Sequence, residues 1–224
     1  MSIDWHVNEY ILKSGTQLFE INAFPYDGLG TIDQSATIAI KVFVRDALVE
    51  NTPRELLLEV PIIEFKKKQL NKYTYSFHFY AEVPYKLTGW SDSIVLTNEN
   101  IEKLTNELYE WYDRFYDIFI NKDLETYTRI NTERFNEIST AFYLTEEEKI
   151  QEKKSQLLSQ NIKKIDITFY RPKFFGNGRV IGLHLPKEPC GFAFESTEVD
   201  NEEIDIELAL FHKKSEEQNL TLIR

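Results

Sequence analysis

Acidic residues gather most densely near the C-terminal end of the chain. The thirteen residues from 195 to 207 contain seven carboxylates and no Lys or Arg. A concentrated negative surface speeds association with a cationic protein and can imitate phosphate. A solvated loop with edge-strand protection is the plain alternative, and a hard cation is a third, although the spacing matches no EF-hand loop. The residues that we predict to contact a partner are Glu195, Glu198, Asp200, Glu202 and Glu203.

The four histidines do not form a local metal-binding pair. His6, His78, His184 and His212 are all too far apart in sequence for the short spacing that zinc ligands use. Each is expected in a strand or at a strand end, where a half-exposed histidine is ordinary. Only His184 and His212 could still meet, across neighbouring C-terminal strands. We therefore predict no metal site.

Motifs for nucleophilic or phosphoryl chemistry are absent from the sequence. There is no Gly-x-Ser-x-Gly elbow and no phosphate-binding loop, and the segment 28–30 lacks the third glycine and the following helix of a glycine loop. Cys190, the only cysteine, has no visible helix N-terminus or histidine beside it to stabilise a thiolate. We expect an inert loop thiol, no catalytic residue and no cofactor, so a binding protein is favoured over an enzyme.

The composition indicates a well-packed globular protein. Of 224 residues, 42% are hydrophobic, and sixteen Phe and twelve Tyr favour a β-containing fold with an aromatic core. Length alone allows one large domain or two small ones. Eight Gly and seven Pro are too few for a linker-rich chain.

The net charge of −11 limits the classes of partner. Nucleic acid and anionic membranes both require clustered Lys and Arg, and the short basic run 66–68 is better explained as a hairpin loop. A protein with a basic surface would suit the charge, because opposite fields accelerate association. The oligomeric state stays open.

We expect a cytoplasmic protein. The start of the chain shows no basic region followed by an apolar run, and no stretch of about 18 apolar residues could span a membrane. A single cysteine excludes an internal disulfide, which fits a reducing compartment.

Residues 1–96 alternate in the manner of β-strands. The alternation covers 18–23, 38–45 and 73–83, and a further strand is predicted from Leu56 to Val60, ending before Pro61. Successive strands without an intervening helix suggest a sandwich or a strongly bent sheet.

Residues 97–162 carry helical spacing instead. Large apolar residues from Ile101 to Phe119 recur every three or four positions and so share one helix face. A second helix is predicted from Asp123, with an interruption at Asn131, and a third from Thr145, where Thr145 and Glu148 match a capping box.

Residues 163–224 return to alternation, with strands predicted at 165–170, 180–185, 192–194, 204–211 and 220–222 and a hairpin turn at 176–178. The sequence thus predicts an α+β protein. A β-rich, sandwich-like part occupies 1–96, and three helices with an antiparallel β-meander occupy 97–224. The change of period places the boundary near residue 96, and one compact unit also fits.

Three segments resemble bacterial immunity proteins, which neutralise toxins used in competition between cells. They are the aromatic helix end 111–116, the restart at 122–125 and the segment 141–147. The resemblance implies tight binding to a cognate toxin, often across its active site.

Two other hypotheses remain. The order of elements in 97–224 resembles the cone-shaped fold of nuclear transport factor 2-like proteins, which implies a pocket for a small molecule or a reaction. Alternatively, exposed Trp5, Tyr10, Tyr85 and Trp90 could form a sugar-stacking platform of a carbohydrate-binding module.

Overall fold

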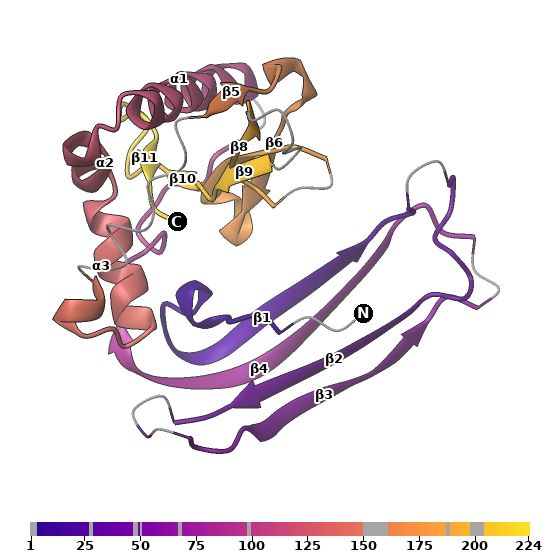
Figure 1. Cartoon of the computed structure of the whole chain (residues 1–224). Helices are drawn as coiled ribbons and strands as arrows, with labels where there is room; N and C mark the ends of the chain where they lie inside the picture. The colour runs from indigo at the N-terminus through magenta and orange to yellow at the C-terminus, as the bar shows by residue number, and fades with distance from the viewer. Residues whose placement is uncertain are drawn as a thin grey trace. The chain divides into compact units, whose positions relative to one another are not determined.

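The computed structural model describes residues 4–26, 29–46, 49, 51–66, 69–97, 100–149, 161–186, 189–197 and 204–224. The chain divides into two compact units, Met1–Lys86 and Leu87–Arg224. The α+β class predicted from the sequence is confirmed, because all sheets are antiparallel and the helices lie in one contiguous part of the chain. The two units are drawn in Figure 1 and are described separately.

The N-terminal unit consists of two antiparallel strand pairs. After the short 3-10 helix η1 (Asn8–Tyr10), β1 (Lys13–Ala23) pairs with β4 (Tyr73–Lys86), and between them in sequence β2 (Thr37–Val44) pairs with β3 (Glu55–Glu64). These are the long strands labelled in Figure 1. Each pair forms a two-stranded sheet of its own.

Alternation along these strands separates an inner face from an outer face. Phe77 and Ala81 of β4 are buried while Ser76, His78 and Tyr80 are exposed, as predicted. Phe19 of β1 lies opposite Phe77 with ring centroids 5.0 Å apart. Both sheets contribute to a small buried cluster, which consists of Ile32, Ile63 and Phe65 with Ala23, Ala36, Ile38, Leu70, Tyr73 and Tyr75 packed around it.

The predicted end of the third strand at Pro61 is wrong. β3 continues through Pro61 to Glu64, and Val60 and Ile63 on either side of the proline pair with Ile40 and Ile38. A two-stranded sheet leaves one edge of each strand unpaired, so a residue without an N–H group can lie there without removing a ladder hydrogen bond. The register shift between Ile38 and Ile40 accommodates the extra residue.

In the C-terminal unit, the first predicted helix corresponds to α1 (Ile101–Ile120), and the second, with its predicted interruption at Asn131, corresponds to α2 (Leu124–Ile130) and α3 (Thr132–Ala141). The Asp123 carboxylate accepts a hydrogen bond from the amide of Thr126 and so begins α2. α1 also buries the aromatic ring of Tyr112 completely. The buried residues of α1 are Leu104, Leu108, Tyr112, Phe115, Ile118 and Phe119.

The capping box at the start of the last predicted helix is present. Glu148 Oε2 accepts hydrogen bonds from the amide and the hydroxyl of Thr145, at 2.7 and 2.8 Å. Helical structure is described from 146 to 149, and the remainder of that predicted helix, from 150 onward, lies outside the described residues.

Seven strands complete the C-terminal unit in two sheets. One has the order β11-β10-β7-β6 and the other β5-β8-β9, all antiparallel. A single bridge between His184 and Cys190 connects them. The order is not that of a simple meander, since β10 pairs with β7 and with β11. The strands are β5 (Ile162–Lys164), β6 (Arg171–Phe175), β7 (Val180–His184), β8 (Phe192–Ser196), β9 (Ile204–Glu207), β10 (Phe211–His212) and β11 (Thr221–Leu222).

The strand predicted at 165–170 is replaced by the 3-10 helix η3 (Ile167–Phe169). The side chain of Asp166 accepts a hydrogen bond from the amide of Thr168, and this local bond competes with strand pairing. The alternation of apolar residues at 165–170 therefore does not correspond to one face of a sheet. Phe169, for example, is exposed. By contrast, the predicted hairpin between β6 and β7 is confirmed, with Asn177 and Gly178 at φ of 56° and 80°.

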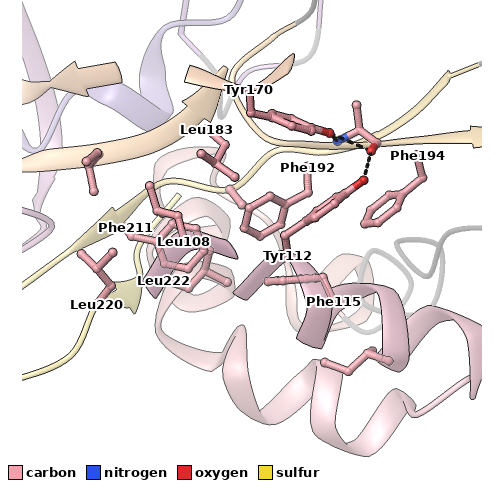
Figure 2. Packing of buried hydrophobic residues seen from close by; sticks show 14 of the residues in the cluster. Leu108, Tyr112, Phe115, Tyr170, Leu183, Phe192, Phe194, Phe211, Leu220 and Leu222 are labelled. Carbon is pink, nitrogen blue, oxygen red and sulfur yellow. Dashed lines mark hydrogen bonds between the residues drawn. The ribbon is translucent and has the colours of Figure 1, made fainter. Parts of the chain in front are cut away.

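An aromatic core fills the interior of the C-terminal unit (Figure 2). Tyr112 stacks on Phe194 with centroids 5.0 Å apart, and Phe115 lies 5.4 Å from Phe192. The hydroxyl groups of Tyr112 and Tyr170 both donate to the carbonyl oxygen of Ala193, at 2.9 Å. Tyr170 and Phe192 also contact the ring of Tyr112, and Phe211 lies against both Phe192 and Trp111 of α1. The core thus ties α1 to both sheets.

Candidate functional site

The predicted acidic partner surface is only partly within the described residues. Glu195 lies on β8, where its carboxylate forms an ion pair with Lys163 of β5 at 2.7 Å. Glu198, Asp200, Glu202 and Glu203 lie outside the described residues. The charge of Glu195 is therefore partly compensated, which the run of acids in the sequence did not indicate.

Glu207, at the end of the same acidic run, is a core residue. It is 5% exposed, and its carboxylate accepts from Arg134 at 2.5 Å and from the Tyr127 hydroxyl at 3.1 Å. Arg134 also donates to Asn131 at 3.0 Å. A buried carboxylate with these partners joins β9 to α2 and α3 and offers nothing to an external partner.

Two further internal ion pairs hold the C-terminal strands to the helices. Glu107 of α1 accepts from Lys213 at 2.6 Å and from the amide of Leu220 at 2.7 Å. Glu137 of α3 accepts from Arg224 at 2.8 Å and from the amide of Gly89 at 2.7 Å. These carboxylates are therefore structural, and sequence position alone could not reveal their partners.

His184 and His212 do not meet. His212 lies opposite Val180, four residues along β7 from His184, and about 13 Å separates such positions at the usual rise of a strand. His212 is fully buried, and its Nδ1 shares a 2.7 Å hydrogen bond with Ser93 Oγ. Within the part of the chain that the structure describes, no group of three or more His, Cys, Asp or Glu could hold a metal ion.

The Cys190 thiol is unsuited to nucleophilic attack. Burial raises its pKa to about 12, and the Sγ atom donates to the carbonyl oxygen of Leu183 at 3.0 Å. A thiol in this state is protonated at neutral pH and is a poor nucleophile. Its environment agrees with the inert loop thiol that the sequence indicated.

Large apolar side chains are exposed on the N-terminal strands. Phe43 of β2 and Leu56 of β3 lie directly opposite each other and are about half exposed, and Ile62 is 64% exposed. On the outer face of the other sheet, Leu18 and Tyr80 are diagonal neighbours across β1 and β4, and Tyr80 is 62% exposed. We call the directly paired Phe43 and Leu56 the apolar strand surface. Exposed apolar groups gathered on one unit are typical of a protein-binding surface.

The sequence contains a clue to the apolar strand surface. A half-solvated strand should alternate with polar residues, but β3 carries Leu56, Leu57 and Leu58 in succession. Both faces of that strand are therefore apolar, and only one can be buried by the small cluster of this unit.

Of the rings predicted to stack on a sugar, Trp5 and Tyr10 are exposed, at 62% and 40%, while the Tyr85 hydroxyl donates to the carbonyl oxygen of Asn8 at 3.2 Å. Tyr80 is the only aromatic residue on the outer face of β4, because Tyr73, Tyr75, Phe77 and Phe79 face inward. In the C-terminal unit, the guanidinium carbon of Arg224 lies over Trp90, 5.4 Å from the centroid of the Trp90 ring.

Comparison with protein-family models, curated proteins and solved structures finds no match. Among the residues that the structure describes, no helix is long and apolar enough to cross a membrane.

Proposed function

We propose that the chain is a non-enzymatic inhibitor of the immunity-protein class, which binds a cognate bacterial toxin and covers its active site. The apolar strand surface carries the proposal, since burying large apolar side chains drives most protein association. Its residues lie on paired strands, so the surface is preformed and loses little conformational entropy on binding.

The distribution of charge supports a partner with a basic surface. The N-terminal unit has eleven acidic and nine basic residues, whereas the C-terminal unit has 26 acidic and 17 basic residues. The negative field thus comes mainly from the C-terminal unit. Such a field accelerates encounter with a cationic toxin, while apolar contacts determine how long the complex lasts.

Coexpression with the protein encoded by the neighbouring gene tests this function. We expect the chain to rescue growth from a toxin encoded there and to copurify with it in a stoichiometric complex. The F43S/L56S double variant should weaken binding at least about 100-fold, because central apolar anchors of an interface dominate its affinity. K41S, on the same strand as Phe43 but with a charged exposed side chain, is the matched control. A toxin that binds F43S/L56S and the parent protein equally would refute the docking surface.

The acidic segment is tested separately. Changing Glu198, Asp200, Glu202 and Glu203 to Lys should slow association and reduce its dependence on salt, because steering charges act on the rate of encounter. If the association rate and its salt dependence do not change, these four residues have no role in toxin binding.

A further inference from the structure

A groove in the C-terminal unit brings together two arginines from different helices. The groove has a volume of about 620 Å³ and is bounded by α1, α2, α3 and β11. Arg114 of α1 and Arg129 of α2 both line it. No ion pair of either residue occurs within the described ranges, whereas Arg134 and Arg224 nearby each hold a carboxylate.

The two guanidinium groups lie close enough to repel each other. Burial and the positive charge of Arg129 both lower the pKa of Arg114. Arg114 lies over the ring of Trp111, with its guanidinium carbon 4.7 Å from the ring centroid, which fixes it at the groove wall. Two like charges that line one groove repel each other, and an anion bound between them would relieve that repulsion.

The carboxylates of the groove are already engaged. Glu137 accepts from Arg224 at 2.8 Å, and Glu133 pairs with Lys214 at 3.5 Å. Neither carboxylate forms an ion pair with Arg114 or Arg129 in the described part of the chain, and the carboxylate that Arg129 does influence is Asp123, whose pKa its charge helps to lower.

The remaining lining suits an organic group attached to an anion. Trp111, Ile130 and Leu222 supply apolar surface, and Asn136 supplies a neutral side-chain amide. The hydroxyls of Thr132 and Thr221 already donate to the carbonyl oxygens of Thr128 and His212. Two planar guanidinium forks match the geometry and the double charge of a phosphate monoester better than those of a monoanionic carboxylate. We propose that this groove binds an organic phosphate monoester, held by Arg114 and Arg129. This site is independent of toxin binding, and its test uses the chain alone.

Calorimetric titration with phenyl phosphate, inorganic phosphate and benzoate tests the site. Phenyl phosphate should bind most tightly, because it combines a dianion with an apolar ring. R114Q and R129Q should each weaken its binding by about tenfold or more, the usual effect of losing a charge-assisted hydrogen bond. K103Q, which removes one positive charge from the exposed surface of α1 outside this groove, should leave it unchanged.

Both arginines are exposed, so their replacement should not unfold the chain, and circular dichroism of each variant checks this. Absence of phenyl phosphate binding would overturn the proposal. Equal binding to R114Q, R129Q and K103Q would also overturn it, as would benzoate binding as tightly as phenyl phosphate.

Discussion

The imidazole of His212 is enclosed by charges as well as by the core. Burial lowers its pKa, and the nearby charges act in both directions: Glu133 and Glu137 raise the pKa, while Lys214 and Arg224 lower it. His212 is therefore neutral in the folded protein at neutral pH. Its bond to Ser93 at 2.7 Å belongs to this neutral, buried state.

Acidification should destabilise the fold through His212. A histidine with a depressed pKa in the folded state binds protons more readily when unfolded, so its contribution to stability is complete above the unfolded pKa of about 6.5 and declines as the pH falls below that value. We expect a lower free energy of unfolding at pH 5.5 than at pH 7.5 by urea denaturation. The difference should shrink in H212Q, whatever the absolute stability of that variant.

Other groups with shifted pKa values must be separated from the effect of His212. The pKa of His184 is also lowered, by burial and by Lys173, so H184Q should remove a second part of the same effect. The carboxyls of Asp123 and Glu148 have lowered pKa values and titrate at more acidic pH. If stability does not change between pH 7.5 and 5.5, the burial of neutral histidines does not contribute as argued.

At the scale of elements, the buried carboxylate of Glu207 connects β9 with α2 and α3. Glu207→Gln should lower the free energy of unfolding by about 3–5 kcal/mol, since it leaves the charge of Arg134 buried without its partner. Urea denaturation measures the change.

Glu195→Gln is the matched control, because it removes a carboxylate from the neighbouring strand. Its ion pair with Lys163 is about half exposed and should contribute less than about 1 kcal/mol. Equal effects of the two substitutions would show that the Glu207 network does not hold these elements together.

Elements with strong local determinants could be predicted from the sequence. The period of α1, the capping box at Thr145 and the left-handed residues Asn177 and Gly178 each depend on nearby residues, and all three are present. The strand predicted at 165–170 failed because one Asp166 side-chain bond overrode the alternation. Sheet order was also beyond the sequence, since pairing of β10 with β7 depends on contacts distant along the chain.

The candidate sites were harder to predict than the elements. A run of acidic residues in the sequence predicts negative charge but does not show which carboxylates are exposed to solvent. Only the structure distinguishes Glu195, in a half-exposed ion pair with Lys163, from Glu207, which is buried with Arg134. The groove with Arg114 and Arg129 could not be predicted from a short sequence pattern, because the two arginines lie on different helices. The apolar strand surface could have been recognised from the three consecutive leucines of β3.

At the scale of the molecule, the two units differ in how much core they possess. The C-terminal unit has an extensive aromatic core, whereas the N-terminal unit has one small cluster. Residues 87–224 expressed alone should therefore fold and give a cooperative thermal unfolding transition.

Near-ultraviolet circular dichroism of the fragment checks the packing of Tyr112 and its neighbours. A non-cooperative transition without aromatic dichroism would mean that the C-terminal unit depends on residues 1–86 for its fold. Because the N-terminal unit has only a small buried cluster among its described residues, we do not expect residues 1–86 to fold when expressed alone.

The apolar strand surface also has a consequence for the amount of protein a cell can tolerate. Two-stranded sheets leave backbone edges unpaired, and apolar side chains beside such edges favour self-association into aggregates. Mutual repulsion opposes this at neutral pH but vanishes near the isoelectric point of about 5.0. Molecules of the chain produced in excess over a binding partner would leave this surface uncovered and would aggregate most readily. The expression level of the chain should therefore not greatly exceed that of its partner.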